Sequence, residues 1–239
     1  MSTTISALSD EAAGISTVAA LMGHPTRAAI LAALVGGGAL PAGTLAQIAD
    51  VTASTASEHL ARLVEGGLLT VVSSGRHRYF RLRDASVAQA LEAVSAVSVS
   101  APARRRTAGP SPEMRLARSC YDHLAGSLGV GLADALLRQG VLLPGERAFE
   151  LTAQGAVRLS ALEVDVASAR TRKRLFSPTC LDWTERRFHL AGALGAAILQ
   201  RFMEARWVAR RTDDRSLRVT VAGQRVLQRE FDLDLPPAP

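Results

Sequence analysis

The sequence predicts a mainly α-helical chain with small β-wings, an α+β fold divided into two domains. Residues 51–83 read as a polar-capped helix followed by two short β-runs. A second pattern, in which helical stretches alternate with short β-pairs, occurs twice after residue 113. Between these parts lies a segment rich in Ala, Ser and Pro that has no apolar period. We therefore expect a domain at 1–97, a linker at 98–113 and a C-terminal domain at 114–239, with repeats at about 114–170 and 174–235.

The composition is that of a folded protein with anionic partners. The chain has 239 residues, 48% of them hydrophobic, which is enough for two domains with cores of their own. The net charge of +6 favours anionic partners. The longest apolar run, Leu190–Leu199, is about half a membrane span, and the first residues lack the basic-then-apolar pattern of a signal peptide. Together with the presence of only two cysteines, these features predict a cytoplasmic protein with no membrane partner.

The segment Thr52–Glu65 is expected to form an exposed amphipathic helix. Thr52 is a suitable N-cap, because its hydroxyl can accept a hydrogen bond from a backbone N–H of the first turn. Glycines at 66 and 67 are expected to end the helix. The opposite face carries short polar and charged groups suited to phosphates and base edges. The apolar residues that share the inner face are Ala56, Leu60, Leu63 and Val64.

Two β-runs and two earlier helices complete this module. The runs Leu68–Val72 and Tyr79–Leu82 flank a turn with cations at its tip, which indicates a β-hairpin. Upstream, Pro25 can begin a helix that ends before the glycines at 36–38, and a second short helix is expected at Gly43–Ala49. This order of elements predicts a winged helix-turn-helix that inserts one helix into the major groove of DNA. The residues expected to contact DNA are Thr52, Ser54, Thr55, Ser57, Glu58, His59, Arg62, Arg76, His77 and Arg78.

Over roughly Leu21–Val97 the chain resembles the ArsR-type (arsenic-repressor-like) winged helix-turn-helix transcriptional regulators. The matching stretches are Leu21 to Arg27, Leu45-Ala46, Ser57 to Leu63, Gly66 to Leu69, Gly75-Arg76 and Tyr79 to Leu82. The resemblance implies a homodimeric, usually repressing, sequence-specific DNA binder whose affinity changes when an effector binds. It also implies dimer contacts from helices at Asp10–Met22 and Asp84–Val97, and a palindromic double-stranded operator with half-sites about one or two helical turns apart. The apolar stripe of the later helix (Val87, Leu91 and Val94) would serve equally well as intramolecular core.

The chain departs from this family at the places where many members bind a metal. Some members carry paired cysteines in the helix before the recognition helix, whereas residues 39–45 of this chain contain none. Others use Asp and His ligands in the helix after the wing, where this chain has Asp84 and Glu92 but no histidine. Neither of these two metal sites of the family is therefore expected in this chain. The effector is therefore unknown, and we expect its site in the C-terminal domain.

An internal repeat organises the C-terminal domain. One copy contains Cys120-Tyr121-Asp122-His123 followed by Leu-Ala-Gly, and the other contains Cys180-Leu181-Asp182 and, after a short insertion, His189 followed by Leu-Ala-Gly. Each copy continues as an apolar helix and later reaches a Thr-x-x-Gly element, at Thr152 and at Thr220. We expect the duplication of a small helical unit with a short β-pair. Such a domain, appended to an ArsR-like regulator, looks like a sensing or dimer-spacing domain.

Six residues of the repeat are candidates for a metal or redox site. They are Cys120, Asp122, His123, Cys180, Asp182 and His189. Thiolate, imidazole and carboxylate ligands suit zinc or copper, so the two copies predict either two sites or one shared four-ligand site. Beyond zinc or copper, the sequence leaves the cofactor unknown.

Three alternatives remain for the same residues. In a redox version, Arg118 and the pair Arg186-Arg187 lower the thiol pKa values, and oxidation joins the two cysteines. In a structural version, the aspartates cap the helices that follow them, the histidines donate to carbonyls and the cysteines are small buried apolar groups. In a third version, an organic ligand occupies an apolar pocket between the repeats, with walls formed by Trp183, Phe188 and Trp207.

The sequence therefore predicts a sequence-specific transcriptional regulator, a homodimeric repressor released or modulated by an effector in the C-terminal domain. The alternatives are a thiol-redox or metal-responsive regulator that uses Cys120 and Cys180, and a non-specific architectural DNA-binding protein. The dedicated base-reading face of the predicted recognition helix argues against the architectural protein. An enzyme is not expected, because the chain has no nucleophile elbow, and the glycines at 36–38 lack the Lys and Ser/Thr of a phosphate-binding loop.

Overall fold

The computed structural model describes residues 2–74, 77–98, 110–211 and 214–235. Contacts within the chain divide it into two compact units, Met1–Val87 and Ala88–Pro239. The division falls within helix α5 (Ala85–Ser98), and the domain limit expected at residue 97 lies later in that same helix. Most of the expected linker, residues 99–109, lies outside the described residues. Each unit buries a set of apolar side chains of its own.

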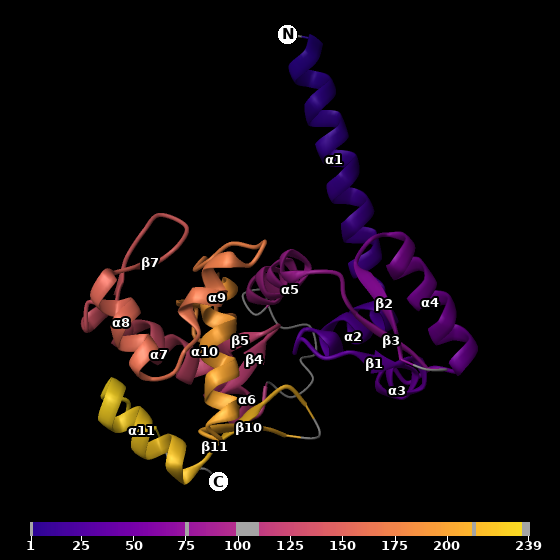
Figure 1. The fold of residues 1–239 in the computed structure, drawn as a ribbon. Helices are drawn as coiled ribbons and strands as arrows, with labels where there is room; N and C mark the ends of the chain where they lie inside the picture. Colours follow the sequence, from indigo (N-terminus) through magenta and orange to yellow (C-terminus); the bar gives the residue numbers. More distant parts are fainter. Residues whose placement is uncertain (1, 75–76, 99–109, 212–213, 236–239) are drawn as a thin grey trace. The chain divides into compact units, whose positions relative to one another are not determined.

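The first unit is a winged helix-turn-helix, as predicted (Figure 1). Its elements are α1 (Ser2–Met22), α2 (Pro25–Leu34), β1 (Leu40–Pro41), α3 (Ala42–Ile48), α4 (Ala53–Glu65), β2 (Leu69–Ser74) and β3 (His77–Leu82). Pro25 occupies the first turn of α2, where its missing N–H has no helical partner to lose. The helices and the hairpin bury Ile30, Leu31, Leu34, Leu45, Ala56, Leu60, Leu63 and Leu82.

The wing contains a third strand that the sequence did not indicate. Strand β1 pairs antiparallel with β3, so the strand order is β1-β3-β2. A two-residue strand is too short to show a period, and a proline within a run argues against a strand. Pro41 is tolerated because β1 lies at the edge of the sheet, and it also precedes the first turn of α3 as its N-cap residue.

Helix α1 is longer than the expected Asp10–Met22, because it begins at Ser2. It extends from the rest of the first unit as a single rod (Figure 1), and residues 12–20 are exposed. Arg27 holds its C-terminus, donating to the carbonyl oxygens of Leu21 and Ala20, each at 2.7 Å. A cation at this end satisfies carbonyls that lack helical partners. Among the described residues no single helix is long and apolar enough to span a bilayer; residues 12–22 and α2 meet that test only as a pair bent by 88°.

The second unit contains two successive sets of elements in the same order: a β-hairpin, a long helix, a short β-pair and a short helix. The first set is β4 (Arg118–Cys120), β5 (His123–Ala125), α7 (Gly126–Arg138), β6 (Leu142–Leu143), β7 (Glu150–Leu151) and α8 (Ala153–Ala161). The second set is β8 (Thr179–Leu181), β9 (Phe188–Leu190), α10 (Gly192–Glu204), β10 (Val208–Arg210), β11 (Leu217–Val219) and α11 (Val221–Phe231). Helix α6 (Pro112–Leu116) precedes the first set, and α9 (Val166–Thr171) lies between the two. The predicted helical unit with β-pairs is confirmed, and its origin by duplication stays a prediction.

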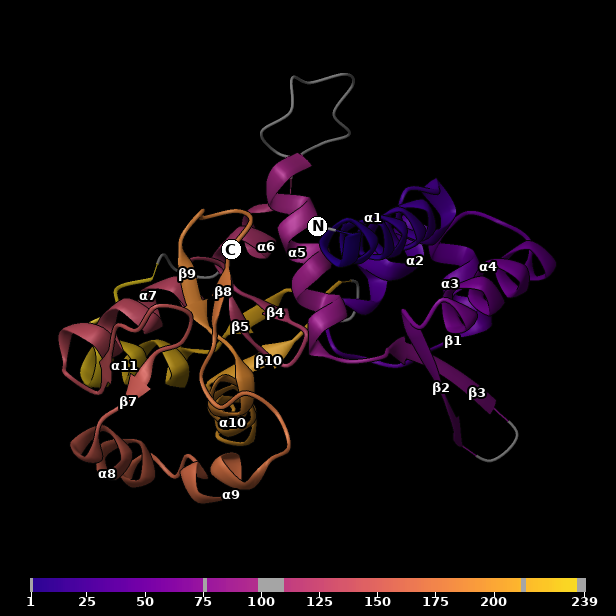
Figure 2. The same ribbon diagram turned by 90° about the horizontal axis from the view of Figure 1, so that it is seen from above.

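The first hairpins of the two sets, β4–β5 and β8–β9, pack against each other. Their contact goes with a crossover, in which the long helix of each set packs against the hairpin of the other set. Helix α7 packs against β9 and α10 packs against β5, so each long helix contacts the hairpin of the other set (Figure 2). At Gly195 the absence of a side chain helps this approach, because a Cβ there would lie only 3.1 Å from the Cβ of His123. A Cβ on Gly129 would instead meet the carbonyl oxygen of Leu124, in its own set, at 2.5 Å. The crossover therefore brings β5 and β9, each with its histidine, into contact.

Candidate DNA-reading surface and Cys–His cluster

The polar face of α4 is presented to solvent, as predicted. Thr52 caps the helix by accepting a hydrogen bond from the backbone N–H of Thr55 at 3.2 Å. The inner face buries Ala56, Leu60 and Leu63. The exposed candidates for DNA contact on this helix and its cap are Thr52, Ser54, Ser57, Glu58 and Arg62, and Thr55 is half-buried. Short polar side chains on an exposed helix allow the close approach that base reading requires.

The wing adds a cation to the same surface. Arg78 is exposed, and its guanidinium lies 5.7 Å from the centre of the Phe80 ring. Arg78 and Ser57 line one hollow between the wing and α4. His77 belongs to β3, but its side chain lies outside the described residues, as does the whole of Arg76.

His59 differs from the other predicted contacts on α4. Its side chain is half-buried, and the centre of its ring lies 4.4 Å from that of His24. Burial, with His24 and Arg27 nearby, lowers the pKa of His59 below its usual value. A neutral imidazole packed in this way offers no charge to a phosphate, so the geometry favours a supporting role for His59 beneath the reading face.

In the second unit, four of the six candidate metal or redox residues come together as a Cys–His cluster of Cys120, His123, Cys180 and His189. The two cysteine Sγ atoms lie 3.9 Å apart and the two histidine Nε2 atoms lie 3.1 Å apart. All four potential ligand atoms lie within 4.8 Å of one another, and all four side chains are buried. The histidines face each other, so the expectation that they donate to carbonyls is wrong.

The hairpins explain how the cluster forms. In each hairpin the cysteine is the cross-strand partner of the histidine, Cys120 with His123 and Cys180 with His189. The insertion before His189 lengthens the turn of the second hairpin and leaves this pairing intact. Each hairpin therefore presents one thiol and one imidazole on the same face.

The two candidate aspartates lie behind the histidines. An Oδ atom of Asp122 is 3.6 Å from Nδ1 of His123, and one of Asp182 is 3.5 Å from Nδ1 of His189. Both Nδ1 atoms are buried and make no hydrogen bond to the part of the chain that the structure describes. Asp122 is also paired with Arg174.

Neither aspartate caps the helix that follows it, so this structural expectation is wrong. Asp182 accepts a hydrogen bond at 2.7 Å from the backbone N–H of Gly126, the first residue of α7. It therefore caps the long helix of the other set, because the crossover places the start of α7 beside the second hairpin. Asp122 lies in the turn of the first hairpin and binds Arg174 instead.

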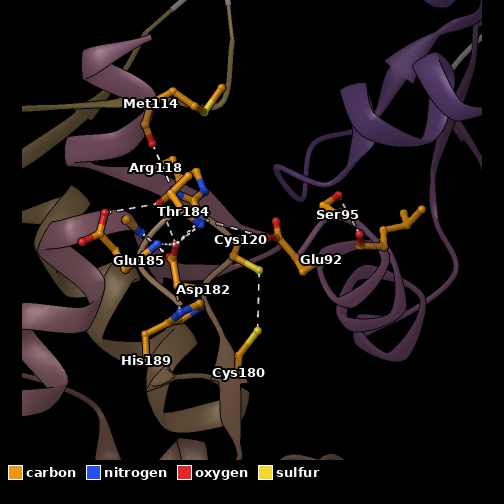
Figure 3. Close-up of polar contacts among 12 residues, drawn as sticks. Glu92, Ser95, Met114, Arg118, Cys120, Cys180, Asp182, Thr184, Glu185 and His189 are labelled. Atoms are coloured by element: carbon orange, nitrogen blue, oxygen red, sulfur yellow. Dashed lines mark hydrogen bonds and ion pairs between the residues drawn. The ribbon is translucent and has the colours of Figure 1, made fainter. Parts of the chain in front are cut away.

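Arg118 organises the polar groups around Asp182 (Figure 3). It is fully buried, and it donates to Oδ1 of Asp182 at 2.9 Å and to Oγ1 of Thr184 at 3.0 Å. Glu92 of α5, itself 2% exposed, lies 4.0 Å from the Arg118 guanidinium and also binds Arg215. Sequence reasoning placed Arg118 near Cys120 but did not find this network, because its partners are distant along the chain.

The thiol of Cys120 is not activated by its surroundings. The hydrogen bond with Cys180 and burial raise the pKa of Cys120 well above its usual value. Burial alone would raise the pKa of Asp182, but Arg118 outweighs it and lowers that pKa. The expectation that Arg118 lowers the pKa of Cys120 is therefore wrong, because its guanidinium is directed to Asp182. Both cysteines are free thiols.

The three aromatic residues proposed as walls of an organic pocket have different surroundings. Trp207 packs edge-on against Phe202, with ring centres 5.0 Å apart. The Arg118 guanidinium lies 5.1 Å from the Trp183 ring, and Phe188 is 55% exposed. Their placement gives no support to a shared aromatic wall.

Part of the first unit matches a family model, and most of the chain matches a curated protein. Residues 22–72 match the family described as a helix-turn-helix domain. Over 222 residues the chain is 37% identical to the uncharacterized HTH-type transcriptional regulator YdfF of Bacillus subtilis (strain 168). That match covers 92% of this chain and 98% of YdfF. The chain belongs to the HTH-type transcriptional regulators. The predicted ArsR-type regulator is thus confirmed at the level of the helix-turn-helix family, and the second unit is part of what this regulator shares with YdfF.

Three solved structures are similar to part of this regulator, and each covers less than half of it. NolR from Sinorhizobium fredii is 27% identical over 37% of this chain and 87% of its own, with a TM-score of 0.35. The transcriptional repressor BigR from Xylella fastidiosa is 24% identical over 38% of this chain and 93% of its own, with a TM-score of 0.35. The homodimeric winged helix-turn-helix DNA-binding domain Mb0332 from Mycobacterium bovis, described as a possible ArsR-family regulator, is 24% identical over 44% of this chain and 93% of its own, with a TM-score of 0.37.

Proposed function

We propose that this regulator is a homodimeric transcriptional repressor that binds a palindromic operator, and that an effector held in the second unit modulates its affinity for DNA. The observation that carries the proposal is the exposed polar face of α4 on a winged helix-turn-helix. Because its proposed target is operator DNA, we expect it to act in the cytoplasm. The architectural alternative lacks such support, since a non-specific binder needs cations but no base-reading face.

The reading of DNA is assigned residue by residue. The first turn of α4 carries Ser54 and Thr55, and the N-terminal residues of a recognition helix are those that reach base edges. Arg62, two turns later and exposed, is suited to a guanine edge or a phosphate. Arg78 of the wing is suited to the phosphate backbone or the minor groove.

Exposed apolar side chains support a dimer. On α1, Ile15 is 64% exposed and Val18 is 38% exposed. On α5, Val94 and Val97 are 56% and 73% exposed. Apolar faces of this kind, on two helices other than α4 and the wing, suit pairing with a second copy of the chain. Two-fold pairing of the two winged helix-turn-helix units would match a palindromic operator. Sedimentation of the full chain tests this part, and a monomer at the concentration that saturates the operator would contradict it.

Helix α5 gives the second unit a means of acting on the first. It begins at Ala85, directly after the wing, and continues into the second unit. There Glu92 is held by Arg118 and Arg215. A ligand that shifts Arg118 would therefore act on the helix that follows the wing.

Selection of operators from random DNA, followed by titration, tests the proposed reading of DNA. Arg62→Ala is expected to weaken binding to the selected operator by about 1–3 kcal/mol. The matched control is Arg225→Ala, which removes an exposed arginine of α11 and is expected to leave operator affinity unchanged. Failure to enrich any sequence, or an equal loss from both substitutions, would instead indicate non-specific electrostatic binding.

A further inference from the structure

We propose that the Cys–His cluster binds one zinc ion in tetrahedral coordination, through Sγ of Cys120 and Cys180 and Nε2 of His123 and His189. The ion would be shared by the two hairpins, with one thiolate and one imidazole from each. Neither the metal site nor its structural role depends on the DNA binding proposed above.

The distances within the cluster fit a tetrahedral zinc site. For zinc–sulfur bonds of about 2.3 Å and zinc–nitrogen bonds of about 2.0–2.1 Å, tetrahedral angles place the sulfurs about 3.8 Å apart and the nitrogens about 3.3 Å apart. The Sγ atoms are separated by 3.9 Å and the Nε2 atoms by 3.1 Å. A disulfide would need the sulfurs at about 2.05 Å. Two thiolates and two imidazoles are also the ligand set that favours zinc over harder cations.

The orientation of the histidines gives an independent reason for a cation. Each Nδ1 faces a carboxylate, Asp122 behind His123 and Asp182 behind His189. A carboxylate there favours the tautomer with the proton on Nδ1, as is usual behind metal-bound histidines. With both Nδ1 atoms protonated, the two Nε2 lone pairs face each other across 3.1 Å. A cation between them converts this repulsion into coordination.

The charges around the cluster favour a divalent ion. Two thiolates and one zinc ion form a neutral core, and each outer aspartate already has an arginine partner, Arg174 for Asp122 and Arg118 for Asp182. Monovalent copper would leave one net negative charge in a buried site, which is costly. Zinc therefore fits the balance of charges better than monovalent copper.

The zinc ion is expected to hold the second unit together. Four protein ligands complete the tetrahedron, as in structural zinc sites, whereas catalytic sites keep one position open. The ion would join β4–β5 to β8–β9, whose cysteines are 60 residues apart in sequence. Because His189 is backed by Asp182, and Asp182 by Arg118, loss of the ion would also loosen the anchor of α5 at Glu92. Binding of zinc would thus contribute to folding of this unit.

Metal analysis of the full chain, purified anaerobically without chelator, tests the proposal. We expect one zinc per chain, with two thiols that react only after the zinc is removed. Replacement by cobalt(II) is expected to give the strong visible absorption of tetrahedral coordination together with a thiolate-to-cobalt charge-transfer band. The cobalt spectrum needs no substitution, so it tests the site in the unaltered protein.

Two variants test whether the zinc binds at the Cys–His cluster. Cys180→Ser is expected to lose the zinc, whereas His24→Gln, which removes a histidine of the first unit, is expected to retain one per chain. The proposal is overturned by a reduced protein that binds no zinc even when zinc is added, by an octahedral cobalt spectrum, by preferential binding of copper(I), or by a Cys120–Cys180 disulfide in the anaerobic protein. Operator binding is measured on the same samples. A protein that binds its operator but no zinc would overturn the metal site and leave the proposed function standing.

Discussion

The polar face of α4 and the Cys–His cluster differ in how they are built. The first comes from a single helix of 13 residues and is exposed to solvent. The second is assembled from two hairpins and is buried. Substitutions on the exposed face should therefore change binding while the fold persists. Substitutions around the buried cluster should change folding and ligand binding together, because each removes a partner from another buried polar group.

The largest difference should appear between two arginines of the second unit. Arg118 is fully buried between Asp182 and Glu92, whereas Arg187 is 60% exposed in its ion pair with Asp134. Arg118→Ala leaves the buried carboxylate of Asp182 without its cationic partner and should lower the free energy of unfolding by about 3–5 kcal/mol. Arg187→Ala should lower it by about 0–1 kcal/mol. Both tryptophans, Trp183 and Trp207, belong to the second unit, so urea unfolding followed by tryptophan fluorescence reports on it. Similar losses from the two substitutions would contradict this account of Arg118.

A smaller effect, on the affinity for zinc, is expected from the aspartate that orients a histidine of the cluster. Asp122→Asn removes the carboxylate behind His123 and should lower the affinity for zinc about 10–100-fold. Asp134→Asn is the matched control. Asp134 has a similar exposed fraction, 27% against 31%, and is also paired with an arginine, but it lies in a surface ion pair. Competition with a chelating dye measures both affinities. Equal affinities in the two variants would mean that Asp122 does not position His123.

The contrast between a surface built from one helix and a cluster built from two distant hairpins also explains which features the sequence could predict. The limits of α4 follow from a local pattern, a polar cap at Thr52, an apolar period and two glycines, and the structure confirms them within one residue. Strand β1 was missed because two residues carry no period. The start of α1 was placed too late, because residues 2–9 carry only two large apolar side chains, Ile5 and Leu8, too few to establish a helical period by themselves.

For the buried cluster, the sequence supplied the candidate ligands but not their arrangement. The repeat singled out the two cysteines and two histidines, yet it left one shared site and two separate sites equally open. The crossover of α7 and α10 gathers all four side chains into one cluster, which favours the shared site, and it depends on packing between distant segments. The ion pair between Arg118 and Asp182 joins residues 64 positions apart, and no local pattern indicates such a pair.

The smallest effects should come from three threonine caps that share one local geometry. Thr52, Thr152 and Thr220 each accept a hydrogen bond from the backbone N–H three residues later. In the second unit each threonine hydroxyl also donates to a backbone carbonyl in the turn that follows the long helix. Thr152 donates to Gly140 at 2.9 Å, and Thr220 donates to Arg206 at 2.7 Å. Thr52 instead shares its second hydrogen bond with the hydroxyl of Thr55 at 2.9 Å, on an exposed surface.

Alanine substitutions should therefore rank these caps by unit. Thr52→Ala should cost about 0.5–1 kcal/mol of stability, near the low end for an N-cap. Thr152→Ala and Thr220→Ala should each cost about 1–2 kcal/mol, because a carbonyl also loses its donor. Serine at each position keeps the hydroxyl and should restore most of the loss. Hydrogen exchange of α4 amides measures the first variant, and tryptophan fluorescence measures the others. Only Thr52→Ala should also weaken operator binding, since only this cap lies at the end of a helix that we expect to enter a DNA groove. A Thr52 variant with unchanged operator affinity would limit this residue to a structural role.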